Sequence, residues 1–284
     1  MIKFGPSGNS ELFYNSGKKS SEQSAVWVKE MGLDCFEYSF GRGVSLTDER
    51  ASEIGKAFNA QGVEISVHAP YYINFANTSE EMIKKSNFYL LESICKGKLM
   101  GANRVVFHPA SQGKLDRQEA VSLTKKRIKD FINIYNDQDI KGFKICPETM
   151  GKHAQIGTVE EITDFCLLAD ELVPAVDFGH VNAREGGSLK TEEDYYKILK
   201  FMIENLGYEK MKNFHVHFSK IEYGLKGEIK HLTFSDQIFG PDYMPFINVI
   251  KDLNLEPYVI SESNGTQDID ALTLKNAYYG IKND

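Results

Sequence analysis

Short apolar runs alternate with longer amphipathic segments along the whole chain. The runs are rich in β-branched and aromatic residues, which is typical of buried strands, and the segments after them have apolar residues at helical spacing. The predicted strands begin near residues 2, 34, 64, 104, 144, 173, 213 and 257. The predicted helices span residues 20–31, 47–61, 79–100, 116–135, 159–171, 191–205, 241–253 and 268–279.

Strict alternation of strand and helix predicts a parallel sheet, and eight such units in 284 residues favour a closed α/β barrel of the (β/α)8 TIM type. An open doubly wound sheet is the alternative. That fold usually carries a GxGxxG loop after its first strand, and residues 5–8 read Gly-Pro-Ser-Gly instead. Because no Pro/Ser-rich linker interrupts the pattern, we expect residues 1–284 to form a single barrel domain.

Metal-binding residue types fall at the carboxyl ends of six consecutive predicted strands. These ends carry His68, His108, Glu148, Asp177 with His180, His217 and Glu262, and His231 follows in the loop after the seventh strand. In a barrel the carboxyl ends of all strands meet at one rim. Imidazoles and carboxylates crowded there would repel or lack partners unless a cation lay among them. The sequence therefore predicts a metal site.

The kinds of ligand narrow the choice of metal. Imidazole mixed with carboxylate, without thiolate, suits Zn²⁺, Mn²⁺ or Fe better than Mg²⁺ or Ca²⁺, which prefer oxygen ligands. The candidates number eight, whereas a catalytic zinc takes about three protein ligands and a water. We therefore expect two metals, and a third stays open.

The composition and charge of the chain restrict its binding partners and its cellular compartment. The formal net charge of −7 provides no broad basic surface, so a polyanion would have to be bound locally. The four cysteines lack CxxC spacing and are expected to be free thiols. The longest apolar stretches fall far short of the ~18 residues that cross a bilayer, and the first residues lack a signal-peptide core. We expect a cytoplasmic, monomeric protein without a membrane partner.

Several short motifs occur in a specific order along most of the chain. They read HAPYYIN at 68–74, VFHP at 106–109, PETMG at 147–151, DFGH at 177–180 and FGPD at 239–242, with His217, His231 and Glu262 completing the series. In this order and spacing the sequence resembles endonuclease IV, a metal-dependent apurinic/apyrimidinic (AP) endonuclease built on a TIM barrel, within the xylose isomerase-like superfamily (AP endonuclease family 2). The stretch 218–234 looks like a less characterised branch of that superfamily.

The resemblance implies a distribution of the ligands. One zinc would be held by His68 and His108, a second by Asp177, His217 and Glu262, and Glu148 would bridge the two. The family's third zinc uses a His matching His180 and an Asp-x-His pair. Here that pair reads Ile229-Lys230-His231, so the aspartate is missing. Glu228 could replace it, and the third site stays open.

The resemblance also implies an activity, hydrolysis of double-stranded DNA 5′ to abasic sites in base excision repair. A hydroxide bridging two metals would attack the phosphorus. Glu148 would be catalytic as the bridge, and a third ion, or Lys230 in its place, would stabilise the leaving 3′-oxygen. Candidate substrate contacts are Tyr71, Asn74, Arg42 and Arg184. Tyr71 could fill the space of the missing base or simply pack on the rim.

Two other functions stay open. A sugar isomerase or epimerase of the xylose isomerase-like superfamily would need a single divalent metal on Glu148, Asp177, His217 and Glu262, with the two glutamates moving protons. It would not need His68, His108, His180 and His231 as ligands. A metal-binding barrel without catalysis is the other alternative. His215 is expected to support a ligand rather than bind metal itself, and Glu37 is either a hydrogen-bond acceptor behind the ligands or an acid/base group.

Overall fold

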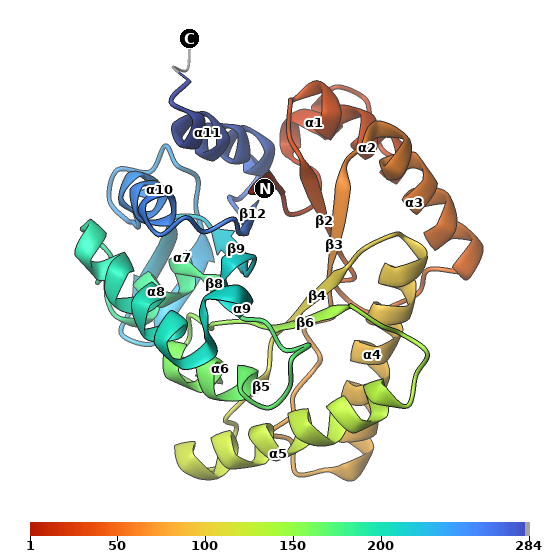
Figure 1. The fold of residues 1–284 in the computed structure, drawn as a ribbon, viewed down its shortest axis with the longest axis vertical. Coiled ribbons are helices and arrows are strands. Elements are labelled where there is room, and N and C mark those ends of the chain that lie inside the picture. The colour runs from red at the N-terminus through yellow and green to blue at the C-terminus, as the bar shows by residue number, and fades with distance from the viewer. Residues whose placement is uncertain (282–284) are drawn as a thin grey trace.

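The structure is a computed structural model, and it describes residues 1–281. Strands surround the centre of the molecule and helices cover their outer side (Figure 1). The wall strands are β1 (Lys3–Pro6), β2 (Cys35–Ser39), β3 (Glu64–His68), β4 (Arg104–Phe107), β6 (Lys144–Pro147), β8 (Ala175–Asp177), β9 (His215–Phe218) and β12 (Tyr258–Ser261). Each begins within two residues of its predicted position.

The wall strands close into a barrel. They form two four-stranded parallel sheets, with orders β1-β12-β9-β8 and β2-β3-β4-β6. Parallel bridges join the sheets on both sides, Ser7 to Glu37 between β1 and β2, and Glu148 to Ala175 between β6 and β8. The predicted (β/α)8 TIM barrel is confirmed.

The eight predicted helices are all present. They are α2 (Ser21–Glu30), α3 (Asp48–Gln61), α4 (Glu80–Leu99), α5 (Arg117–Asn136), α6 (Val159–Cys166), α8 (Glu192–Leu206), α10 (Tyr243–Asp252) and α11 (Gln267–Tyr279). Side chains of Ser20, Thr47 and Thr158 accept hydrogen bonds from the first helical turns that they precede. The helix predicted over 159–171 ends early at Cys166, where the Lys210 ammonium binds the carbonyl oxygens of Cys166 and Ala169.

Several short elements have no counterpart in the sequence pattern. They are α1 (Glu11–Asn15), α7 (Phe178–Arg184), α9 (Tyr208–Lys212), β5 (Ala110–Ser111), β7 (Gln155–Ile156) and an antiparallel hairpin of β10 (Ile221–Gly224) and β11 (Gly227–His231). Each is too short to show a clear period. Helix α7 and the hairpin follow the carboxyl ends of β8 and β9, so they are placed to shape the predicted rim.

Apolar and aromatic side chains pack between the wall and the helices. At the amino end of the barrel, a buried arginine helps to fill the interior. Arg104 is fully buried there, with its guanidinium 4.3 Å from the Tyr258 ring centroid and donating to Asn213 Oδ1 at 2.7 Å.

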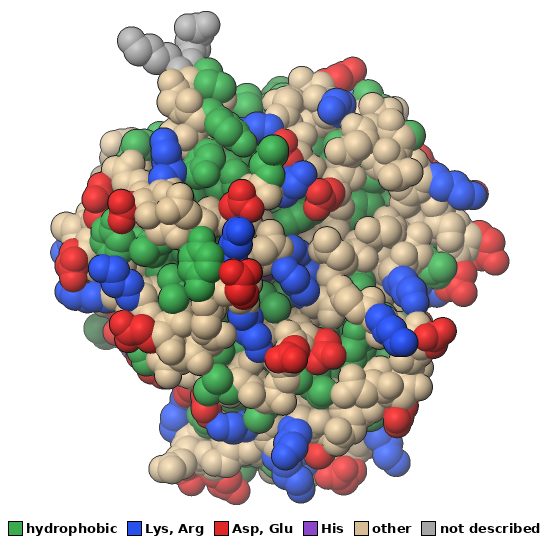
Figure 2. All heavy atoms as spheres, viewed as in Figure 1, with side chains coloured by type: hydrophobic (Ala, Val, Ile, Leu, Met, Phe, Trp, Pro, Cys, Tyr) green, Lys and Arg blue, Asp and Glu red, His purple; other side chains and the backbone are tan. Residues whose placement is uncertain are grey.

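Charges of both signs are intermixed on the face drawn in Figure 2. All four cysteines are free. Within residues 1–281, no helix is long and apolar enough to cross a membrane.

Candidate metal centre

The residues predicted as metal ligands converge at the carboxyl end of the barrel. They form three groups, in each of which one candidate ligand atom per residue lies within 4.8 Å of the others. The first group is His68, His108 and Glu148, the second group is Glu148, Asp177, His217 and Glu262, and the third group is His180, Glu228 and His231. The structure thus brings together all nine residues, including Glu228.

The first group is built on three neighbouring strands. His68 ends β3, while His108 and Glu148 directly follow β4 and β6. Glu148 Oε2 lies 3.3 Å from His68 Nε2 and 3.1 Å from His108 Nε2. Since Glu148 is almost completely buried, its carboxylate is fixed between these rings.

The second group uses the other oxygen of the same carboxylate. Glu148 Oε1 lies 2.8 Å from His217 Nδ1, and this nitrogen is also 3.5 Å from Glu262 Oε2. Asp177 and His217 are register partners on the paired strands β8 and β9. One carboxylate therefore turns one oxygen to each group, which is the arrangement expected of a bridging ligand.

The third group lies beside the second but rests on other elements. His180 is in the first turn of α7, where its backbone N–H donates to Asp177 Oδ1 at 2.8 Å. Glu228 and His231 come from β11. Glu228 Oε2 is 3.4 Å from His180 Nε2, and Glu228 Oε1 is 4.0 Å from His231 Nε2. Glu228 thus lies between the two histidines, as a replacement for the missing aspartate would have to.

Close glycine contacts hold the hairpin over this end of the barrel. Glu228 N donates to Gly151 O at 3.1 Å, and Gly227 has φ of 87°. A Cβ at Gly227 would lie 2.1 Å from Gly151 O, and a Cβ at Gly151 would lie 2.7 Å from Glu228 Cβ. Only glycines permit this approach, so they set the distance between Glu228 and His180.

In four of the histidines, one ring nitrogen lies at hydrogen-bond distance from a supporting oxygen atom, and the other nitrogen faces one of the three ligand groups. The Nδ1 atoms of His68 and His180 lie 2.8 Å from Ala69 O and 2.9 Å from Thr149 O. His231 Nδ1 is 2.9 Å from Ser219 Oγ, and His217 Nε2 is 2.8 Å from Glu37 Oε1. Protein metal ligands commonly have such partners, which fix the ring and leave the second nitrogen free to bind.

The donor set fits divalent metal ions. Asp177 is fully buried, and its Oδ2 accepts no hydrogen bond within residues 1–281, although it lies 3.2 Å from His180 Nδ1; burial raises the pKa of this carboxyl. A buried carboxylate oxygen without a donor is costly unless a cation neutralises it. Because Asp177 belongs to the second group, an ion held there would lie beside this carboxylate.

The pKa values of two histidines also indicate a strong negative charge in the centre. Burial opposes protonation of His68, but the hydrogen bond and charge of Glu148 outweigh it and raise the pKa of His68 to about 8. For His180, burial is likewise outweighed by Asp177 and Glu148, and the pKa rises to about 10. The carboxylates thus favour positive charge on these rings, and a divalent ion would compete with the protons for the same negative charge.

Comparison with known proteins shows the family of the chain. The model of the xylose isomerase-like TIM barrel family matches residues 25–277. The chain belongs to this family. An uncharacterised protein of Methanocaldococcus jannaschii is 29% identical over 88% of this chain and 89% of its own length. A probable endonuclease 4 of Staphylococcus aureus is 26% identical over 82% of this chain and 79% of its own.

Solved structures with the family's fold differ in activity. A D-tagatose 3-epimerase-like protein superposes with a TM-score of 0.72 at 21% identity, covering 99% of this chain and 98% of that one. Endonuclease IV from Thermus thermophilus superposes with a TM-score of 0.70 at 18% identity, covering 98% and 99%. At these identities the structural likeness shows the fold, and the residues of the metal centre must decide between the activities.

A cavity of about 350 Å³ opens over the three groups of this family member. Besides His68, His108, His180, Glu228, His231 and Glu262, it is lined by Ser7, Ser39, Tyr71, Met150, Lys152 and Gln155. Tyr71 is 56% exposed, and its ring centroid is 6.4 Å from that of His108. Tyr71 is therefore the predicted substrate contact that the structure places at the cavity.

Three other predicted residues lie apart from the cavity lining. Asn74 Oδ1 accepts hydrogen bonds from Ala76 N and Ser111 N, both at 3.1 Å. The Arg184 guanidinium binds backbone carbonyls of the loop after β6, including Lys152 O at 2.7 Å. Arg42 is exposed on the loop after β2. Asn74 and Arg184 thus shape loops around the site.

Lys230 also lies outside the cavity lining, although it is in β11 between Glu228 and His231. Its ammonium pairs with Glu222 Oε2 at 3.1 Å, and the side chain is 61% exposed. Glu228, rather than Lys230, faces the third group. The catalytic role predicted for Lys230 would require its side chain to move.

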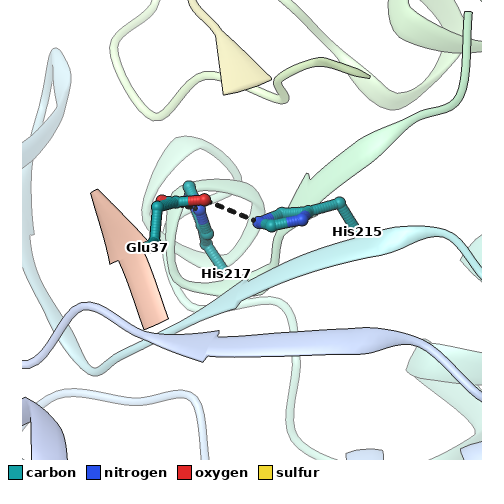
Figure 3. Close-up of side chains that lie close together, drawn as sticks. All are labelled: Glu37, His215 and His217. Atoms are coloured by element: carbon teal, nitrogen blue, oxygen red, sulfur yellow. Dashed lines mark hydrogen bonds and ion pairs between the residues drawn. The ribbon is translucent and has the colours of Figure 1, made fainter. Parts of the chain in front are cut away.

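Below the ligands lies a second set of buried polar side chains. Glu37, His215 and His217 are all fully buried and lie close together (Figure 3). Burial lowers the pKa of His215 to about 4 although Glu37 is adjacent. Glu37 does not line the cavity. Glu37 is the middle residue of β2 rather than its last, so its position along the strand does not indicate its place under His217.

Proposed function

We propose that this chain is a metal-dependent phosphodiesterase that hydrolyses duplex DNA 5′ to abasic sites and so acts in base excision repair. One observation carries the proposal: three ligand groups lie at one barrel mouth, and Glu148 joins two of them. A phosphodiester needs several positive charges around its phosphate, which adjacent divalent ions provide. The 26% identity to a protein named probable endonuclease 4 supports the same conclusion.

The residues present suit zinc in the first and second groups, and Glu228 supplies the charge and the spacing that a third ion would need. When bound, such ions would polarise a water and neutralise the phosphate oxygens. The chain's own part is to hold its ligands rigidly. Glu148 sets the separation of the first and second groups, and the buried hydrogen bonds of His68, His180 and His217 fix their rings.

Contacts with DNA would come from the rim. Tyr71 is exposed beside the first group and could stack where a base is missing. Lys152 lines the cavity and Arg42 is exposed, so both could meet backbone phosphates. These few local cations suit an acidic protein that binds a polyanion at one site.

A sugar isomerase or epimerase is the second candidate. The second group alone, Glu148, Asp177, His217 and Glu262, would hold the single ion such an enzyme needs. The fold shared with the D-tagatose 3-epimerase-like structure is compatible with this candidate. Against it stand the first and third groups, because a one-metal sugar enzyme gives their histidines nothing to bind.

The test combines metal counting with a defined substrate. The purified chain should hold two or three zinc ions by mass spectrometry, whereas one ion fits the sugar enzyme. A labelled duplex with one tetrahydrofuran abasic analogue should be nicked on its 5′ side to leave a 3′-hydroxyl. A chelator should abolish the nick and zinc should restore it.

Two controls make the result decisive. The same duplex without the analogue should stay intact, which separates abasic cleavage from a contaminating nuclease. Ketohexoses incubated with the enzyme in D₂O should gain no deuterium at C3. An intact abasic duplex under metal-replete conditions, together with deuterium uptake into a sugar, would overturn the proposal in favour of the epimerase.

A further inference from the structure

The Glu37 carboxylate is buried at the base of the metal centre but belongs to none of the three groups. It lies on β2, and its side chain crosses the barrel interior to His217 on β9 (Figure 3). Glu37 Oε1 is 2.8 Å from His217 Nε2, and Oε2 is 3.1 Å from His215 Nε2. Ser66 Oγ also donates to Oε2, at 2.9 Å.

The two nitrogens of His217 face opposite ways. Nδ1 lies 2.8 Å from Glu148 Oε1 and 3.5 Å from Glu262 Oε2, inside the second group. Nε2 faces Glu37. A ring that binds metal through Nδ1 carries its proton on Nε2, and this proton needs an acceptor because His217 is fully buried. Glu37 is the acceptor that the structure supplies.

We propose that Glu37 is a positioning residue for the metal centre, which holds the His217 ring with Nδ1 aimed at the second group and increases its donor strength. The inference rests on an ion in the second group, which both candidate functions require. Ser66 in turn fixes Glu37, because Glu37 and Ser66 are register partners on β2 and β3. A contact from β2 to β9 also links the two four-stranded sheets.

The same residues offer a second arrangement, which the test must separate from the first. Glu37, His215 and His217 could themselves surround an ion, since their candidate ligand atoms lie within 4.8 Å of one another. The contact of 2.8 Å between Glu37 and His217 is a hydrogen-bond distance, and it engages the nitrogen that such an ion would need. The geometry therefore favours support of His217 over a fourth metal site.

The experiment measures metal release from the zinc-loaded full chain by chelator competition. Glu37→Gln keeps the shape but removes the charge, and Glu37→Leu also removes the hydrogen bond. One ion should be bound about 10–100-fold more weakly in Glu37→Gln, and more weakly still in Glu37→Leu. The first and third groups should retain their ions as in the wild type. Glu64→Gln on neighbouring β3 is the matched control, and it should release every ion as the wild type does.

Each outcome has one meaning. A loss of affinity restricted to one ion, at unchanged circular dichroism, supports the positioning role, because general destabilisation would loosen every ion alike. Wild-type release from Glu37→Gln would overturn it. A stoichiometry lower by one ion at saturating zinc would also overturn it, in favour of a site at Glu37 itself. If the wild-type chain binds no metal, both this inference and the proposed function are wrong. If it binds a single ion, only the proposed nuclease activity is wrong, and the effect of Glu37 on that ion can still be measured.

Discussion

The second and third groups lie side by side at one end of the barrel, yet different parts of the fold support them. Asp177, His217 and Glu262 stand at or directly after the ends of three adjacent wall strands. In the third group, Glu228 and His231 belong to a hairpin outside the wall. Their side chains are 12% and 26% exposed, whereas Asp177 and His217 are fully buried.

This difference affects how each group can be lost. The backbone hydrogen bonds of the wall fix the second group, so its ligands cannot separate unless the barrel opens. The third group depends on a glycine contact between the hairpin and the loop after β6. We therefore expect the third ion to be removable without disturbing the others, while damage to the bridging carboxylate should empty the first and second groups together.

Replacing Glu148 with Ala is expected to have the largest effect. It removes the one side chain shared by the first and second groups and leaves the surrounding histidines without a common carboxylate. Two ions should be lost and cleavage of the abasic duplex should fall to background, while an ion in the third group can remain. Metal content by mass spectrometry and the nicking assay measure this, with Glu64→Ala as the control. Full metal retention in Glu148→Ala would show that Glu148 is no bridge.

Gly151→Ala is designed to break the third group alone. Its Cβ would lie 2.9 Å from both Glu228 Oε2 and His180 Cδ2, so the hairpin must shift. We expect the loss of one ion and a decrease in nicking of about 10²-fold, the usual cost of one charge-stabilising group. Gly224→Ala is the matched control in the same hairpin, because its Cβ meets only Ile229 Cδ1 at 3.4 Å. Loss of all ions in Gly151→Ala would mean that the groups are not separable.

The same contrast explains how much could be predicted from the sequence. The first and second groups were accessible because the strand ends could be located within two residues and the closed barrel brings all strand ends to one rim. For Glu148, Asp177 and Glu262 the chain position therefore already implied proximity. The pairing of Glu148 Oε1 and Oε2 with separate histidines needed the side-chain geometry.

The third group and the substrate residues depend on features without periodicity. The turn of the hairpin and the Gly151–Gly227 contact decide where Glu228 points, and neither has a pattern in the chain. Arg184 illustrates the same limit, since a rim arginine can bind phosphate or backbone carbonyls and only the structure shows the carbonyls. The contact of Glu37 with His217 has no signal in the sequence, because it spans the barrel between strands that are not adjacent.

Tyr71→Ala tests whether the first group has a substrate contact beside it that the metals do not need. The ring lines the cavity and is largely exposed, so its removal should leave the metal content unchanged. Loss of one stacking contact of about 1–3 kcal/mol should lower kcat/KM for the abasic duplex about 5- to 150-fold. Tyr72→Ala is the control, because Tyr72 is similarly exposed but packs near Tyr89, away from the cavity lining. Equal losses in both variants would argue against stacking by Tyr71.

Lys230→Ala should have the smallest effect, and it asks whether the hairpin contributes a ligand or a cation. Lys230 pairs with Glu222 on the exposed side of the hairpin, while Glu228 faces His180. An exposed ion pair is worth about 0–1 kcal/mol, so nicking should change less than about fivefold and all ions should stay bound. Glu228→Gln in the same strand should instead weaken one ion. If Lys230→Ala lost activity about 10²-fold with full metal content, the hairpin would act through its ammonium, and the third group would not need an ion.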